Sequence, residues 1–167
     1  MDPRPRDFPD RSLPLLPSVL AFLDFVSTTA VNKVAGLSEE QARRTPVPTS
    51  PVLSPLGLLK HLTAVQRQHL QIHLGGQDLP SLWDADDHDA EFRLGPDETI
   101  ASVVAAFDAE CERSRATLAG LDPERPITTY GEPNTAGRLL VDVLQECARH
   151  LGQLDLVREL IDGDRGE

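Results

Sequence analysis

Residues 145–155, "QECARHLGQLD", place a carboxylate and an imidazole four residues apart in a segment with helical apolar periodicity. Residues four apart share one face of a helix, with Cβ atoms about 5–6 Å apart. Glu146 and His150 therefore point the same way, as does Asp142 one turn earlier. An unpaired buried charge costs several kcal/mol. A partner must therefore compensate these groups, either an Arg or His from a facing helix or a metal ion.

A second histidine lies in an apolar turn, His61 in "LLKHLTAV". Taken alone, such a residue is more often a hydrogen-bonded core histidine than a metal ligand. Together with Glu146 and His150, however, it forms a set of two imidazoles and one carboxylate. Helical bundles commonly build metal sites from facing helices, and three protein ligands leave one coordination position open, as in catalytic sites. We therefore expect His61, Glu146 and His150 to hold one divalent metal ion.

The remaining histidines point less clearly to a site. His69 follows His61 by eight residues, which in an α-helix rotates it by about 80° from His61, so it either borders the pocket or faces solvent. His73 lies one turn further on. His88 lies in the acidic run "DADDHDAE", which lacks the glycine and closing glutamate of a calcium-binding EF-hand loop. We interpret this run as a solvated loop.

Other polar residues near the expected site have supporting roles. Gln153 could orient a metal ligand or a water molecule, and Arg149 or Arg67 could contact an anionic substrate, although exposed arginines are by default solvated. Cys111 and Cys147 fall at positions compatible with burial and show no CxxC spacing, so they are expected to be small core residues. Neither is expected to be a nucleophile.

Apolar residues at spacings of three and four predict an all-α chain, a four-helix bundle with long crossover loops and no sheet. Capping residues and glycines give the expected helix ends. The long acidic loop after the second long helix contains Trp83 and Phe92, which we expect to pack on the body of the protein. The expected helices cover residues 14–34, 38–44, 54–75, 99–119 and 135–161.

Composition limits the partners. A net charge of −11 without a basic patch argues against nucleic acid and anionic membranes. No apolar run approaches the length of a membrane span, and the polar, Pro-rich start is not a signal peptide. We expect a cytoplasmic protein with a flexible N-terminal arm, residues 1–12, and a single domain, residues 13–163.

Several segments resemble the DinB-like (YfiT-like) superfamily of metal-binding four-helix bundles, in particular its actinobacterial branch related to mycothiol-dependent enzymes. The similarity extends over nearly the whole chain after about residue 12. The segments that carry it are "GLSEEQARRTPVPTS", "SPLGLLKHLTAVQR", "LWDADDHDAEFRL", "TIASVVAAFDAECERSRA" and "ECARHLGQLDLVRELIDG".

In that superfamily a His on the second long helix and a His/Glu-x-x-x-His pair on the fourth hold a divalent metal. The resemblance places these roles on His61, Glu146 and His150. Close relatives often have His where this chain has Asp142 and Gln153, and an acidic-aromatic pattern where it has Gln66 and His69. The resemblance thus covers the metal ligands more completely than the substrate pocket.

The activity implied by the resemblance is a metal-dependent transfer or isomerisation that uses a low-molecular-weight thiol, mycothiol first, with bacillithiol or glutathione as alternatives. Zinc is the expected metal, with nickel, manganese or iron as other candidates. A small molecule is the expected partner, and a homodimer is plausible from the resemblance. Alternatives are a hydrolase with metal-bound water, a non-haem iron oxygenase, whose triads usually occupy β-barrels, and a non-catalytic metal-binding or stress-response module.

Overall fold

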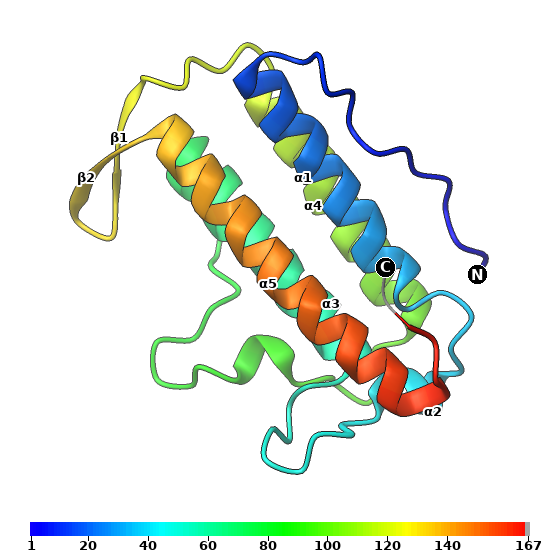
Figure 1. The fold of residues 1–167 in the computed structure, drawn as a ribbon. Coiled ribbons are helices and arrows are strands. Elements are labelled where there is room, and N and C mark those ends of the chain that lie inside the picture. The colour runs from blue at the N-terminus through cyan, green and yellow to red at the C-terminus, as the bar shows by residue number, and fades with distance from the viewer. Residues whose placement is uncertain (166–167) are drawn as a thin grey trace.

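A computed structural model describes residues 1–165, which are mostly helical (Figure 1). Four long helical segments dominate the chain, and the second of them changes from α-helix to π-helix. A short helix, a 3₁₀ turn and a two-stranded hairpin occupy the connections. The elements are α1 (Leu15–Asn32), α2 (Glu39–Arg43), α3 (Pro55–Val65), η1 (Gln66–Leu74), η2 (Ala90–Phe92), α4 (Ile100–Leu118), β1 (Pro126–Thr129), β2 (Glu132–Thr135) and α5 (Ala136–Asp162).

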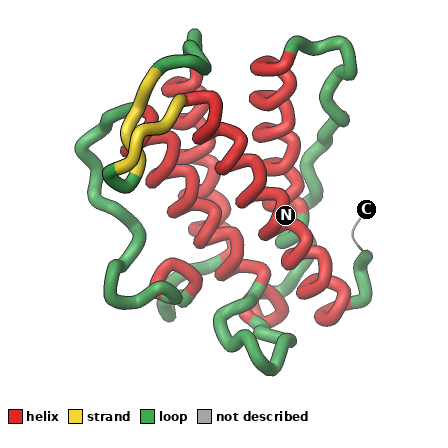
Figure 2. The backbone as a smooth tube through the Cα atoms, turned by 60° about the vertical axis from the view of Figure 1, so that its left-hand side comes forward, coloured by secondary structure: helices red, strands yellow, loops and turns green. Residues whose placement is uncertain are grey.

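The long helices lie side by side around one apolar core. Helix α5 packs against α1 and α3, and α4 packs against α3 and its continuation η1 (Figures 1 and 2). Phe107 of α4, Leu59 of α3 and Leu154 of α5 are at most 1% exposed, in a single apolar cluster. Trp83 and Phe92 of the acidic loop pack against this cluster, as the sequence predicted.

Local capping explains where the helices begin. The side chains of Ser38 and Thr99 each accept a hydrogen bond from the third residue of their helix in a reciprocal capping box. The side chains of Ser54 and Thr135 likewise accept a hydrogen bond from the third residue of α3 and α5, without the reciprocal bond of a capping box. Because these caps satisfy amide groups that the helix cannot, the expected and observed helix starts agree within a residue or two.

The sequence pattern predicted a second long helix that is α-helical throughout, but its second half is not. From Gln66 to Leu74 it is a π-helix, in which hydrogen bonds run from residue i+5 to i. An α-helix turns about 100° per residue, whereas a π-helix with about 4.4 residues per turn rotates only about 80°. Over the four residues 66–69 the difference is about 80°, so His69 returns toward the face that carries His61.

The expectation of a chain without strands is wrong for residues 126–135. They form an antiparallel hairpin, with Thr129 paired to Glu132 across the Tyr130-Gly131 turn. Both turn residues have positive φ, 53° for Tyr130 and 83° for Gly131, and two successive positive φ values are typical of tight hairpin turns. The strands of four residues were too short and too polar to show alternation in the sequence.

The N-terminal segment, expected to be a flexible arm, makes specific contacts. Arg4 binds the Asp108 carboxylate of α4 with both terminal guanidinium nitrogens, at 2.6 and 2.7 Å. Its backbone amide also donates to the Asn32 side chain at 2.7 Å. Through these contacts the segment that precedes α1 lies against both α1 and α4. The mobility of the arm stays a prediction.

Helix α1 departs from the expectation that no segment could span a membrane. In the described part of the chain it is the one helix long and apolar enough to do so by length and composition. A helix that packs in the core of a soluble protein passes the same test, and α1 packs along α5. The property is therefore weak support for a membrane segment.

A charged group lies inside the packing between η1 and α4. The Glu110 side chain is 1% exposed and accepts hydrogen bonds from the guanidinium groups of Arg67 and Arg113. Gln71, fully buried in η1, donates to the Glu110 carbonyl and to Ser114 Oγ, both at 3.1 Å. Burial raises the pKa of Glu110, but the bonds from both arginines outweigh it and hold the pKa below its usual value.

Replacing Glu110 with Gln should lower the free energy of unfolding by about 1–3 kcal/mol at neutral pH, because two arginines lose their charged acceptor. A depressed carboxylate pKa contributes stability that is present above the unfolded pKa of about 4.3 and lost as pH falls through the folded pKa. The difference between parent and variant should therefore shrink below about pH 4 in urea unfolding series. Glu112→Gln, an exposed neighbour on α4, is the control and should change little.

Candidate metal centre

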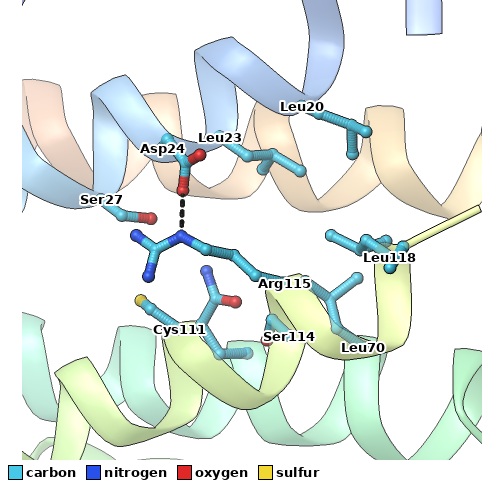
Figure 3. A pocket seen from close by; sticks show the side chains of 11 residues that line it. Leu20, Leu23, Asp24, Ser27, Leu70, Cys111, Ser114, Arg115 and Leu118 are labelled. Carbon is cyan, nitrogen blue, oxygen red and sulfur yellow. Dashed lines mark hydrogen bonds and ion pairs between the residues drawn. The ribbon is translucent and has the colours of Figure 1, made fainter. Parts of the chain in front are cut away.

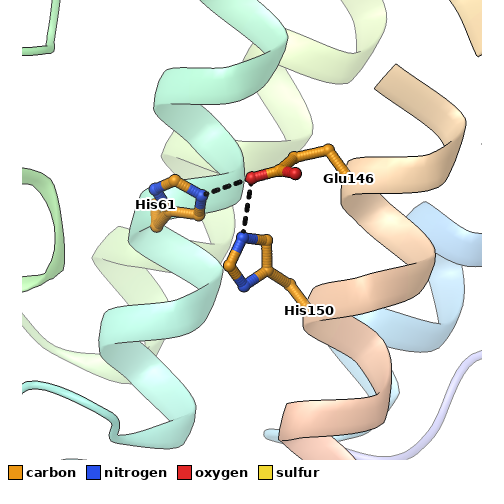
Figure 4. Close-up of side chains that lie close together, drawn as sticks. All are labelled: His61, Glu146 and His150. Atoms are coloured by element: carbon orange, nitrogen blue, oxygen red, sulfur yellow. Dashed lines mark hydrogen bonds and ion pairs between the residues drawn. The ribbon is translucent and has the colours of Figure 1, made fainter. Parts of the chain in front are cut away.

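Helices α3 and α5 bring the three predicted ligands together (Figure 4). His150 Nε2 lies 2.9 Å from Glu146 Oε1, and His61 Nε2 lies 3.7 Å from the same oxygen. The imidazole rings of His61 and His150 meet edge to face, with centroids 4.4 Å apart. One donor atom from each residue lies within 4.8 Å of the other two. The structure thus assembles the set that the spacing predicted.

These distances fit a single small cation. Zinc bonds of about 2.0–2.1 Å in tetrahedral geometry separate neighbouring donors by about 3.3 Å. The observed 2.9 and 3.7 Å lie on either side of that value. Neither ring nitrogen of His61 has a hydrogen-bond partner although both are buried, and a buried polar atom without a partner is costly. A cation at Nε2 would supply the missing partner.

The contacts of His150 also favour a cation at this site. Its Nδ1 lies 2.7 Å from Gln153 Oε1, while its Nε2 lies 2.9 Å from Glu146 Oε1. A neutral imidazole carries one N–H and can donate to only one of these oxygens. A cation bound to Nε2 removes the conflict, because Nδ1–H then donates to Gln153. The structure thus places Gln153 directly behind a candidate ligand, where the sequence analysis expected an orienting group.

Electrostatics favours the ligand forms of these side chains. Burial and, to a smaller extent, the neighbouring His150 lower the pKa of His61 to about 4, against the opposing effect of Glu146. At neutral pH His61 therefore offers a free lone pair. Burial raises the pKa of Glu146, but the hydrogen bond from His150 and the charges around it outweigh burial, so the pKa lies below its usual value. Glu146 is thus an anion.

Three other predicted residues surround the centre with different contacts. Burial lowers the pKa of His69 to about 4, and Glu146 and Asp142 act on it in the opposite direction, which agrees with its return to the His61 face. Asp142 accepts a hydrogen bond from Arg138 at 2.9 Å. Arg149 is exposed. Arg67, the other arginine considered for substrate binding, is instead committed to Glu110.

Two residues near His61 were not predicted as part of the site. The Phe92 ring stacks on the His61 ring, with centroids 4.2 Å apart and planes 9° apart. Glu91 Oε1 lies 3.4 Å from His61 Nδ1. Glu91 belongs to the acidic run that we interpreted as solvated, yet its side chain is only 11% exposed. The apolar Phe92 beside it was the one signal in the sequence that this part of the loop turns inward.

Neither cysteine is one of the three clustered donor residues. Both are buried, and burial raises the pKa of each thiol to about 12. Cys111 lines a cavity of about 180 Å³ between α1 and α4, where Arg115 Nε donates to Asp24 Oδ1 at 2.7 Å (Figure 3). A thiol with so high a pKa is not a nucleophile at neutral pH.

Fold and site together define a mostly helical protein with a largely buried His/Glu/His cluster that could hold a metal. The profile of the mycothiol S-transferase family matches residues 18–163, so the chain belongs to that DinB-like family. The crystal structure of a conserved protein from Enterococcus faecalis has a similar fold, with a TM-score of 0.69 and 15% identity. That match covers 92% of this chain and 100% of the other. A search of curated proteins gave no significant match.

Replacing His150 with Ala should remove one of the three donors and sharply lower the metal content that survives dialysis. We expect a loss of affinity beyond the roughly 10–100-fold typical for an outer partner of a ligand. Elemental analysis of purified protein measures it. His88→Ala, which changes an exposed histidine, is the matched control, and equal metal content in all three proteins would contradict the assignment.

Proposed function

We propose that the protein is a metal-dependent transferase that activates a low-molecular-weight thiol, mycothiol first, at His61, Glu146 and His150. The observation that carries this proposal is the convergence of both imidazole Nε2 atoms on one oxygen of Glu146 in a member of the mycothiol S-transferase family. We further propose that the four long helical segments form a DinB-like four-helix bundle, supported by the packing of α5 on α1 and α3.

The partial exposure of one ligand supports catalysis over a purely structural role. Both histidine side chains are less than 10% exposed, whereas that of Glu146 is 30% exposed. A structural metal usually has four protein ligands, but three with an accessible side leave a position for substrate. We therefore place the approach of the thiol on the Glu146 side of the cluster.

The ligand charges suit a thiolate. Two neutral imidazoles and one carboxylate would leave a bound divalent cation with a net charge of about +1 at the site. When bound there, the cation would lower the pKa of a thiol from its free value of about 8.5. Gln153 would hold the ring of His150 in place while the thiol binds, and Phe92 would keep water from one face of His61.

The second substrate would bind next to His69. The His69 ring lies 5.3 Å from that of Trp83 and 6.2 Å from that of Tyr130, measured between centroids. Glu146 and Asp142 are close enough to influence the pKa of His69. The neutral rings suit an electrophile with apolar surface, and the two carboxylates disfavour an anionic one. This placement also corresponds to one of the two expectations for His69, that it borders the pocket.

A hydrolase is the second candidate, because the same exposed side of the centre could accept water instead of a thiol. An isomerase that uses the thiol as cofactor would need the same centre. We assign zinc as the metal, since two nitrogens and one carboxylate oxygen suit it, with nickel, manganese or iron as alternatives. We also propose a small-molecule partner and a cytoplasmic location; a homodimer stays a prediction.

Titration of cobalt-substituted protein with mycothiol tests the proposed function directly. A thiolate-to-cobalt charge-transfer band should grow in the near ultraviolet and be absent from the His61→Ala variant. Bacillithiol and glutathione serve as comparison thiols. The Cys111→Ala/Cys147→Ala double variant should give the same band as the parent, because both native thiols are buried and protonated.

The outcomes separate the candidates. A band in the parent and in the cysteine-free variant supports external thiol binding at the centre. No band with any of the three thiols, in protein shown to contain cobalt, contradicts the transferase proposal and favours hydrolysis.

A further inference from the structure

Each candidate histidine ligand has an oxygen acceptor behind it. Gln153 Oε1 lies 2.7 Å from His150 Nδ1, on the side of the ring away from Glu146. The corresponding group at His61 is Glu91, whose Oε1 lies 3.4 Å from Nδ1. Both rings therefore direct Nε2 toward Glu146 and Nδ1 toward an outer oxygen. The two outer groups differ in charge, an amide behind His150 and a carboxylate behind His61.

Glu91 is placed to control which nitrogen of His61 carries the proton. Its side chain is 11% exposed, and His61 is the ion-pair partner found for it within residues 1–165. A neutral imidazole that donates from Nδ1 keeps its lone pair on Nε2. At 3.4 Å, Glu91 Oε1 and His61 Nδ1 do not yet form a hydrogen bond. A shift of about 0.5 Å would bring them to ordinary bonding distance.

The fold fixes Glu91 through the residues that follow it, at the end of η2 and just beyond. Phe92 stacks on the His61 ring, and Lys60 Nζ donates to the carbonyl oxygen of Arg93 at 2.7 Å. Gly57, one turn before His61 on α3, allows the turn to approach closely. A Cβ at Gly57 would lie 2.6 Å from the Phe92 carbonyl oxygen, closer than such contacts are found. The turn that carries Glu91 is thus docked on the helix that carries His61.

We propose that Glu91 is a positioning residue, which accepts a hydrogen bond from His61 Nδ1–H and so presents Nε2 to the cation. This inference rests on the proposed metal site. Carboxylates behind ligand histidines fix the ring, select the tautomer and increase the basicity of the ligand nitrogen, and their loss typically costs 10–100-fold in metal affinity. In this role Glu91 would act through His61 and would not itself be a ligand of the cation.

The first test compares zinc affinities of parent, Glu91→Ala and Asp89→Ala by competition with a chromophoric chelator. Asp89 is exposed and lies two residues before Glu91, so its variant removes a carboxylate from the same segment without removing the acceptor behind His61. We expect affinity to fall about 10–100-fold in Glu91→Ala and by less than about 2-fold in Asp89→Ala. Equal losses in both variants, or no loss in either, would overturn the proposal.

The second test does not need the metal. Nitrogen-15 NMR of the metal-free parent should show His61 as the Nδ1–H tautomer, with this preference reduced in Glu91→Ala. Gly57→Ala, which pushes η2 away, should reduce it as well. An Nε2–H tautomer in the parent overturns the role of Glu91. Failure of the parent to bind zinc, with the Nδ1–H tautomer present, contradicts the proposed metal function and leaves the Glu91–His61 contact supported.

Discussion

The site depends on one packing constraint: α3 and α5 lie close enough for His61 and His150 to reach the same oxygen of Glu146. His61 is on one helix and the other two groups are on the other. Burial keeps His61 neutral and costs free energy for every polar atom that lacks a partner. The apolar residues that pack the helices together therefore also bury ring nitrogens of His61 without a partner, and a cation would supply that partner.

Three surrounding elements position the residues of this cluster. Gln153 orients His150 from the same helix, one turn further along. The docked η2 turn covers one face of His61 with Phe92 and places Glu91 behind the ring. The π-helical turn rotates His69 toward the carboxylates of α5. Since π-turns are often found at functional sites, this departure from regular geometry supports the proposal that the second substrate binds next to His69.

Helical periodicity and capping residues were enough to predict the long helices and to pair Glu146 with His150. His61 could be added because its apolar neighbours required burial. The π-helix could not be predicted, since its hydrogen-bond shift leaves no simple pattern in "QRQHLQIHL". The hairpin was missed because its strands of four residues are short and polar. Glu91 was missed because only tertiary docking through Gly57 and Phe92 separates it from the solvated acids beside it.

X-ray absorption at the zinc edge tests the central claim most directly, that one cation sits between α3 and α5 with a position left for a thiol. Zinc-loaded protein should show nitrogen and oxygen neighbours at about 2.0–2.1 Å, with imidazole scattering from two histidines. Addition of mycothiol should introduce one sulfur neighbour at about 2.3 Å. A spectrum without imidazole scattering, or one that mycothiol leaves unchanged, would contradict the account.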